Sequence, residues 1–159
     1  KNDILVLYSD IIFDSKIIQQ ILCSKKNISI AIDMNWEKMY EGRTDHHMSE
    51  AENIQLDKMN KIVEIRKNIQ NKNKRVGEFL GIIKFSLNGA ELFVKKYEEL
   101  IKIHNGTFQQ APSISKAYIT DMIQELLIQK ISVKPIIVDG NWCEIDTPQD
   151  LENAKNMFK

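Results

Sequence analysis

Short apolar runs along the chain predict the strands of a sheet. Residues 4–8 are continuously apolar and rich in β-forming side chains, which is the pattern of a buried strand, and residues 28–33 predict a second one. Between them Asp14 or Ser15 can cap a helix. Its apolar side chains recur at helical spacing, namely Ile17, Ile18, Ile21 and Leu22. Strand, helix and strand in this order favour a right-handed parallel crossover.

The middle of the chain predicts a long loop followed by a strand pair. Residues 35–60 are polar and without clear periodicity, and long segments of this kind often carry function. Residues 61–69 alternate well enough for a strand, and residues 78–85 predict another. Because only the polar turn 70–74 separates them, we expect an antiparallel pair.

The remaining elements complete a mixed α/β pattern. Ser86 can cap a long amphipathic helix that continues to about residue 103, and a polar loop follows over residues 104–116. Further on we expect a helix from Tyr118 or Thr120 to Gln129, strands at 133–138 and 142–145, and a closing helix at 148–158. The predicted fold is a single domain over residues 1–159, with a mainly parallel sheet flanked by helices.

Composition narrows the class of protein. A chain of 159 residues with 43% hydrophobic content can bury a core of its own. Lys and Arg together number 22, as do Asp and Glu, so no net charge attracts nucleic acid or an anionic membrane. No apolar stretch approaches the roughly 20 residues that span a bilayer. Cys23 and Cys143 lack metal-type spacing, which favours a reducing compartment, and we expect the cytoplasm.

The segment after residue 138 places two carboxylates at the end of a strand. Thr147 can cap the helix behind them, Pro148 suits its first position, and Asp150 lies where a carboxylate satisfies free N–H groups. Glu144 and Asp146 alternate and therefore share one face of the strand. Helix capping explains Asp150 but leaves these two carboxylates unexplained.

Asp10 follows the first strand, and ligands of open α/β sheets collect at the carboxyl ends of strands. Helix capping is the alternative role for Asp10, although Asp14 and Ser15 are better placed for it. If Asp10 is free, Asp10 and Asp146 can bind a divalent cation together. Mg²⁺ needs only a few oxygen ligands from the protein when a substrate phosphate completes its coordination.

Five segments, in order along nearly the whole chain, resemble the sugar-phosphate nucleotidyltransferase superfamily. They are Leu7-Tyr8-Ser9-Asp10-Ile11-Ile12-Phe13, Ile32-Asp33 with Trp36, Gly77-Glu78-Phe79-Leu80-Gly81, Tyr118-Ile119-Thr120-Asp121 and Trp142-Cys143-Glu144-Ile145-Asp146-Thr147. Within the superfamily the pattern is most similar to the phosphocholine and aminoalkylphosphonate cytidylyltransferases, including domains fused to phosphoenolpyruvate mutase.

The resemblance implies a catalytic site. Asp10 and Asp146 would hold Mg²⁺ with Glu144 beside them, and a phosphate or phosphonate oxygen of the acceptor would attack the α-phosphorus of CTP while pyrophosphate leaves. Lys67 falls where such enzymes place a substrate-contacting lysine, and the alternative is an exposed strand lysine. A sugar 1-phosphate is the alternative acceptor.

Aromatic residues suggest how a cationic acceptor could be bound. Glu78 or Asp121 would add negative charge, while Asp33 and Arg43 could orient the substrate or form a solvated loop pair. The rings that could enclose an amine by cation–π contact are Trp36, Tyr40, Tyr118 and Trp142, with core packing as the alternative. We expect His46 and His47 to be structural or exposed, since adjacent loop histidines rarely share one ion.

One part of the family pattern has no counterpart in these residues. The family's Gly-rich loop, which binds the nucleotide phosphates, is not found among the six glycines, and the chain starts at Lys1-Asn2-Asp3 rather than Met. We therefore expect a fragment that corresponds to the C-terminal two-thirds of such an enzyme. A non-catalytic domain that binds a partner, a homodimer, and fusion to another enzyme domain all remain open.

Overall fold

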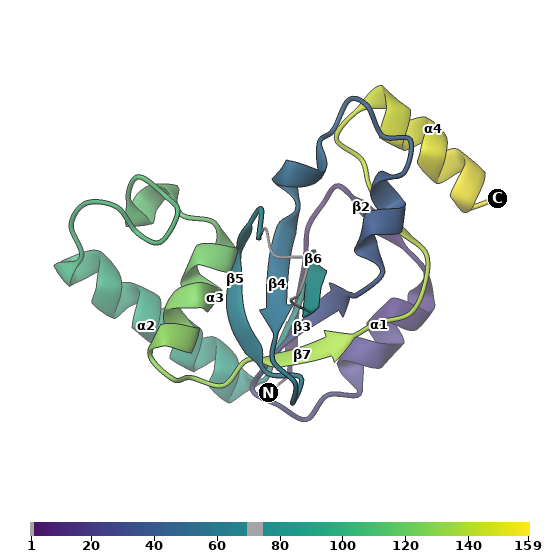
Figure 1. Ribbon diagram of the computed structural model, residues 1–159. Helices are drawn as coiled ribbons and strands as arrows, with labels where there is room; N and C mark the ends of the chain where they lie inside the picture. The colour runs from purple at the N-terminus through teal and green to yellow at the C-terminus, as the bar shows by residue number, and fades with distance from the viewer. Residues whose placement is uncertain (1, 70–74) are drawn as a thin grey trace.

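One six-stranded sheet, centred on the long strand β6 (Arg75–Phe85), organises the protein (Figure 1). The computed structural model describes residues 2–69 and 75–159. Along the sheet the strands follow the order β5-β4-β6-β3-β7, and β1 also pairs with β6. The other strands are β1 (Ile4–Leu7), β3 (Ile28–Asp33), β4 (Glu52–Leu56), β5 (Ile62–Lys67) and β7 (Lys134–Ile137).

Strand β6 changes its partner halfway along one edge. Its first residues, 75–78, pair with β4, and its last residues, 82–85, pair with β1, both antiparallel. Between the two stretches Gly81 adopts a φ of 65°, and its carbonyl accepts a hydrogen bond of 2.9 Å from the backbone N–H of Tyr8. The end of β1 therefore meets the start of β4 beside the middle of β6.

Helices cover both faces of the sheet, as the alternation of side chains along β3 requires. Ile30 and Ile32 pack on the side of α2 (Leu87–Ile103) and α3 (Ile119–Ile128). Ala31, between them, faces the opposite side, where α1 (Ser15–Leu22) packs (Figure 1). Each face thus has its own buried apolar cluster.

A small second sheet lies beside the main one. Strand β2 (Ile11–Phe13) pairs antiparallel with β8 (Trp142–Glu144), and the backbone N–H of Ile145 donates to the carbonyl of Asp10 at 2.7 Å. This pairing brings two segments that lie about 130 residues apart in sequence to the same place. Helix α4 (Pro148–Met157) follows, and the 3₁₀ helices are η1 (Trp36–Tyr40), η2 (Met48–Glu50) and η3 (Ile114–Lys116).

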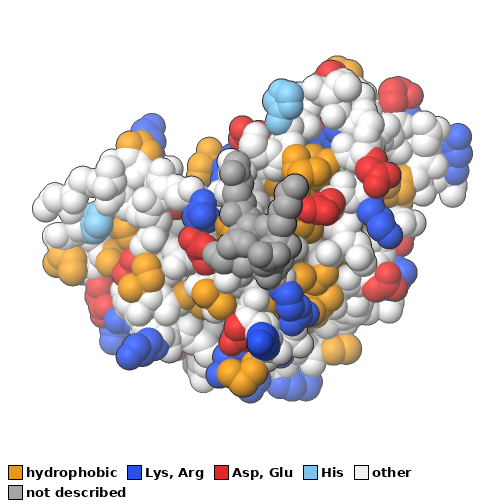
Figure 2. Space-filling view, viewed as in Figure 1, with side chains coloured by type: hydrophobic (Ala, Val, Ile, Leu, Met, Phe, Trp, Pro, Cys, Tyr) orange, Lys and Arg blue, Asp and Glu red, His pale blue; other side chains and the backbone are white. Residues whose placement is uncertain are grey.

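Most of the predicted elements are confirmed. The fold is mixed α/β with a sheet flanked by helices, Ser86 caps α2 by accepting from the N–H of Gly89 at 3.1 Å, and Thr147 caps α4 by accepting from the N–H of Asp150 at 3.2 Å. Strands β1 and β3 run in the same direction, but on opposite sides of β6. Acidic and basic side chains are interspersed over the face drawn in Figure 2. Among the described residues no helix has the length and apolar character needed to cross a membrane.

Three predictions about the sheet are wrong. Within the described residues only β3 and β7 pair in parallel, so the sheet is mainly antiparallel. Strands β5 and β6 are not neighbours, because β4 lies between them and pairs with both. Segment 35–60, predicted as a loop, contains this β4. The predicted turn at 70–74 lies outside the described residues.

Candidate functional site

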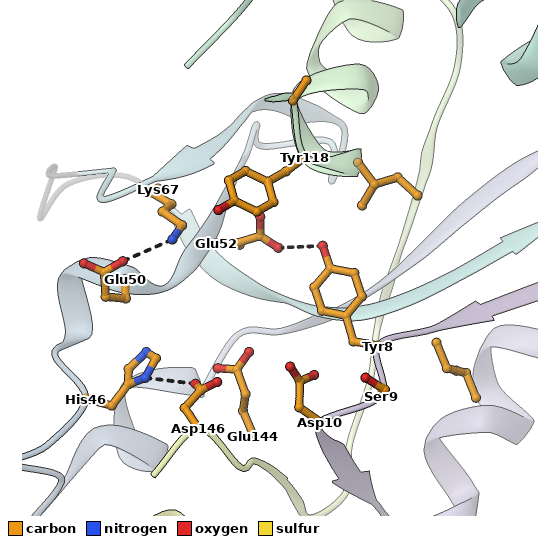
Figure 3. Close-up of a pocket in the computed structure, with 13 residues that line it drawn as sticks. Tyr8, Ser9, Asp10, His46, Glu50, Glu52, Lys67, Tyr118, Glu144 and Asp146 are labelled. Carbon is orange, nitrogen blue, oxygen red and sulfur yellow. Dashed lines mark hydrogen bonds and ion pairs between the residues drawn. The ribbon is translucent and has the colours of Figure 1, made fainter. Parts of the chain in front are cut away.

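A cavity of about 680 Å³ opens where β1 meets β4 (Figure 3). Because β6 exchanges one partner for the other at this point, side chains from both strand ends converge on the space. Segments 8–10, 46–52 and 117–119 supply most of the lining. The polar and aromatic side chains that line the cavity are Tyr8, Ser9, Asp10, His46, Glu50, Glu52, Lys67, Tyr118, Glu144 and Asp146.

Three carboxylates form one wall of this cavity. Figure 3 shows Asp10, Glu144 and Asp146 side by side, brought together by the pairing of β2 with β8. Burial, followed by the negative charges of Asp146 and Asp10, raises the pKa of Glu144 to about 7. Glu144 is partly buried, whereas Asp10 and Asp146 are exposed to the cavity. Such a group of mutually repelling oxygens fits a hard divalent cation, which would relieve the repulsion. The structure thus assembles the carboxylates predicted as metal ligands.

Lys67 lies across the cavity from the carboxylates. Its Nζ is 3.1 Å from Oε2 of Glu50 and 5.7 Å from the centre of the Tyr118 ring. Burial alone would lower the pKa of Lys67, but its ion pair with Glu50 raises the pKa above the ordinary value. The lysine is therefore a cation that faces the site, as a phosphate-binding group must be.

Glu52 is a partly buried site residue for which the sequence predicts no role. Its carboxylate accepts hydrogen bonds from the Tyr8 hydroxyl at 3.1 Å and from Oγ1 of Thr120 at 2.7 Å. Burial raises its pKa, although these two hydrogen bonds act in the opposite direction. The polar character of segment 35–60 indicates function, but it does not reveal that the segment contains the strand that orients Glu52.

His46, which was predicted to be structural or exposed, lines the cavity. Its Nδ1 is 2.9 Å from Oδ2 of Asp146, whereas His47 is exposed. The contact joins residues that are 100 positions apart, and nothing in the local sequence of either one indicates it.

The predicted aromatic cage is not formed. Three of its rings are buried, and their polar atoms bond within the protein: Nε1 of Trp36 donates to the carbonyl of Val76 at 3.2 Å, the Tyr40 hydroxyl to Glu78 at 2.6 Å, and Nε1 of Trp142 to Asp33 at 2.9 Å. Of the four rings only Tyr118, which is 62% exposed, lines the cavity.

The charged residues predicted to contact substrate mostly serve the structure. Asp33 and Glu78 accept the bonds just described, and neither lines the cavity. The Arg43 side chain is only 4% exposed, so it does not form the solvated loop pair given as its alternative role. Its Nε lies 2.7 Å from Oδ1 of Asp150. Asp121 caps α3 by accepting from the N–H of Tyr118 at 2.9 Å, but it also lines a neighbouring cavity of about 540 Å³ that shares Glu52 and Lys67 with the first.

Comparison with known proteins gives one curated relative and two structural neighbours of interest, while no family model matches the chain. The chain is 28% identical over 155 residues to a CTP:phosphoglutamine cytidylyltransferase from Campylobacter jejuni, an alignment that spans 96% of this chain and 58% of the relative. The inositol-1-phosphate CTP transferase from T. maritima has a TM-score of 0.63 at 18% identity, with 99% of this chain and 55% of that chain covered. A protein from Bacillus anthracis, described as a glucose-1-phosphate thymidylyltransferase in complex with a sucrose, has a TM-score of 0.61 at 15% identity, with 98% and 54% covered.

These likenesses confirm the predicted resemblance to the sugar-phosphate nucleotidyltransferase superfamily. Within that class, the curated relative is a cytidylyltransferase by name. The chain spans 58% of the length of this relative and about half of each structural neighbour.

Proposed function

We propose that the protein is an Mg²⁺-dependent nucleotidyltransferase that uses CTP to activate a small phosphorylated or phosphonylated amine. The observation that carries this proposal is the convergence of Asp10, Glu144 and Asp146 on one wall of a cavity, with Lys67 on the other (Figure 3). The cytidylyltransferase relative, aligned over 96% of the chain, supports the choice of nucleotide.

The roles of the residues follow from their charges. Asp10 and Asp146, with Glu144 beside them, would hold Mg²⁺, which when bound neutralises the triphosphate and stabilises the charge that develops on it. Lys67 binds the phosphate of the acceptor and orients one of its oxygens toward the α-phosphorus. That oxygen forms the new P–O bond, the bond to pyrophosphate breaks, and pyrophosphate leaves with the electron pair.

An acceptor phosphate would compete with Glu50 for the ammonium of Lys67. The two side chains are 41% and 55% exposed, and an ion pair this exposed contributes little to stability. Replacing the Glu50 carboxylate by an acceptor phosphate at Lys67 therefore costs little free energy.

The far side of the cavity suits an amine. The Glu52 carboxylate and the Tyr118 ring both face the space near Lys67, and these are groups that attract an ammonium. They support a phosphorylated amine over a sugar 1-phosphate, which remains the second candidate because the fold is shared with a protein described as a glucose-1-phosphate thymidylyltransferase.

Pyrophosphate release from CTP and Mg²⁺ tests the proposal, with the polypeptide at its natural length and with phosphoglutamine, phosphocholine or glucose 1-phosphate as acceptor. We expect Asp10→Asn and Asp146→Asn each to lower the rate at least about 100-fold, because each removes a charged cation ligand. Asp139→Asn serves as the control, since Asp139 is exposed and its carboxylate pairs, among the described residues, with Lys16 alone.

Other results would favour the alternatives. Equal turnover of phosphocholine and glucose 1-phosphate would contradict an amine acceptor. Saturable binding of CTP without pyrophosphate release from any acceptor would contradict catalysis and support a binding domain.

A further inference from the structure

The contact between His46 and Asp146 has the geometry of two ligands of one ion. Two neighbouring ligands of an octahedral ion, each about 2.1 Å from it, lie about 3.0 Å apart. The observed separation between Nδ1 of His46 and Oδ2 of Asp146 is 2.9 Å. Figure 3 shows both side chains on the same wall as Glu144 and Asp10. A cation held by this wall can therefore reach the imidazole nitrogen without any change in the separation of the two ligand atoms.

His46 is held in this position by its own loop. Gln149, in the first turn of α4, accepts from the N–H of Thr44 at 2.9 Å and of Asp45 at 3.4 Å, and donates to the carbonyl of Gly42 at 3.1 Å. The segment that carries His46 is thus attached to the helix that begins just after Asp146. Ligands held by such contacts lose little freedom when they bind an ion.

Two further contacts fix the same segment. Arg43 lies against Asp150, and the His46 ring packs beside the Tyr40 ring with 6.1 Å between the centroids. The His46 side chain is only 16% exposed as a result. An imidazole that is buried and directed at a carboxylate has few orientations to lose.

Asp150 comes equally close but is not available as a ligand. One ligand atom each from His46, Asp146 and Asp150 lies within 4.8 Å of the other two. The oxygens of Asp150, however, already accept from Thr147 N at 3.0 Å and from Thr147 Oγ1 at 2.9 Å, and pair with Arg43 at 2.7 Å. The donors left to an ion are the imidazole and the carboxylates of the cavity wall.

We propose that His46 is a direct ligand of the cation held by Asp146, which makes this a mixed nitrogen and oxygen site. The inference rests on the proposed function, because it assumes that the carboxylate wall binds a cation. An imidazole ligand favours transition metals over Mg²⁺, so Mn²⁺ and Zn²⁺ should bind more tightly than at an all-oxygen site.

Metal binding measured without substrate tests the inference. In the polypeptide at its natural length, titration calorimetry with Mn²⁺ would compare the unmodified protein with His46→Ala, His47→Ala and Asp146→Asn. We expect His46→Ala to weaken Mn²⁺ binding at least about tenfold. His47→Ala, which alters the adjacent exposed ring, should leave it unchanged.

Nitrogen NMR of the unmodified protein gives a second measurement that does not depend on how the variants fold. Addition of Zn²⁺ should shift the Nδ1 resonance of His46 and leave both nitrogens of His47 in place. If His46→Ala binds Mn²⁺ as tightly as the unmodified protein while Asp146→Asn does not, the imidazole is only a hydrogen-bond partner of Asp146, and the inference is wrong. If the unmodified protein binds neither ion, the metal requirement of the proposed function is wrong as well.

Discussion

At the scale of single residues, burial and hydrogen bonding decide whether the pKa of a carboxyl group rises or falls. Burial would raise the pKa of Asp150, but hydrogen bonds from Arg43 and Thr147 lower it below the ordinary value. Burial raises the pKa of Glu78 to about 8, since one hydrogen bond from Tyr40 only partly offsets it. Sequence alone identified Asp10 and Asp146 because the ends of strands are visible locally. It could not show that Trp36 is buried, because the strand whose carbonyl it contacts comes from another part of the chain.

Glu78 should make stability depend on pH. Its pKa rises from 4.5 to about 8 on folding, so between these values the folded protein keeps a proton that the unfolded chain releases. The stability that this neutral group contributes is complete below about pH 4.5 and is lost as the pH rises through about 8. Glu78→Gln stays neutral and can still accept from Tyr40. Relative to the unmodified protein, the variant should therefore gain several kcal/mol between about pH 5 and pH 9.

Urea unfolding of both proteins at the two pH values measures this gain. Glu98→Gln, a change at an exposed glutamate, controls for the loss of one charge. A difference between Glu78→Gln and the unmodified protein that does not vary with pH would show that Glu78 is ionised in the fold.

At the scale of elements, local signals predicted ends of helices better than partners of strands. The Thr147 and Asp150 capping box could be predicted because both side chains act within one turn. Strand β4 was missed because its five residues, Glu52–Leu56, include three polar ones within a polar segment. Strands β5 and β6 are separated because β4 pairs with both of them. The periodicity of side chains within a strand does not specify which strands become its neighbours.

Gln149 of helix α4 should stabilise the loop that precedes η2. Gln149→Ala removes the acceptor for the N–H groups of Thr44 and Asp45 and the donor to Gly42. Since each hydrogen bond contributes about 1 kcal/mol, amide exchange at Thr44 and Asp45 should accelerate roughly tenfold. Hydrogen exchange followed by NMR would measure this.

Glu152→Ala is the matched control, because Glu152 lies on the same helix and forms a surface ion pair with Lys155. Unchanged protection of the two amides in Gln149→Ala would mean that other contacts hold the loop.

At the scale of the whole molecule, the cavity exists because one strand serves two partners. Strand β6 pairs with β4 and then with β1, and the Tyr8 ring lies against Gly81 where the partners change. The same Tyr8 donates to Glu52, so a single side chain joins the two strand ends. The segments that the cavity needs could be recognised in the sequence, but the exchange of partners that brings them together could not.

Gly81→Ala should be markedly destabilising. A side chain at this φ of 65° is strained by about 1–2 kcal/mol, and its Cβ would also overlap the Tyr8 ring. Gly106→Ala is the control, because Gly106 has a φ of 87° but no atom within 4 Å of a Cβ at that position. Urea unfolding should show a larger loss for Gly81→Ala, by about 1–3 kcal/mol, as expected for overpacking. Equal losses would mean that Tyr8 moves aside without cost.

The hydrogen bonds between Gln149 and the loop indicate which of these residues can change during evolution. Three of these bonds join Gln149 to main-chain atoms of the loop, at Gly42, Thr44 and Asp45, and a fourth runs from its Nε2 to Oγ1 of Thr44 at 3.3 Å. A main-chain atom is the same whatever side chain the residue carries. Asp45 can therefore be replaced over generations without loss of a bond to α4, and a change at Thr44 loses only one, whereas a change at Gln149 loses all four at once. In related proteins that keep the loop in this place, we expect the amide at position 149 to vary less than the residues it binds.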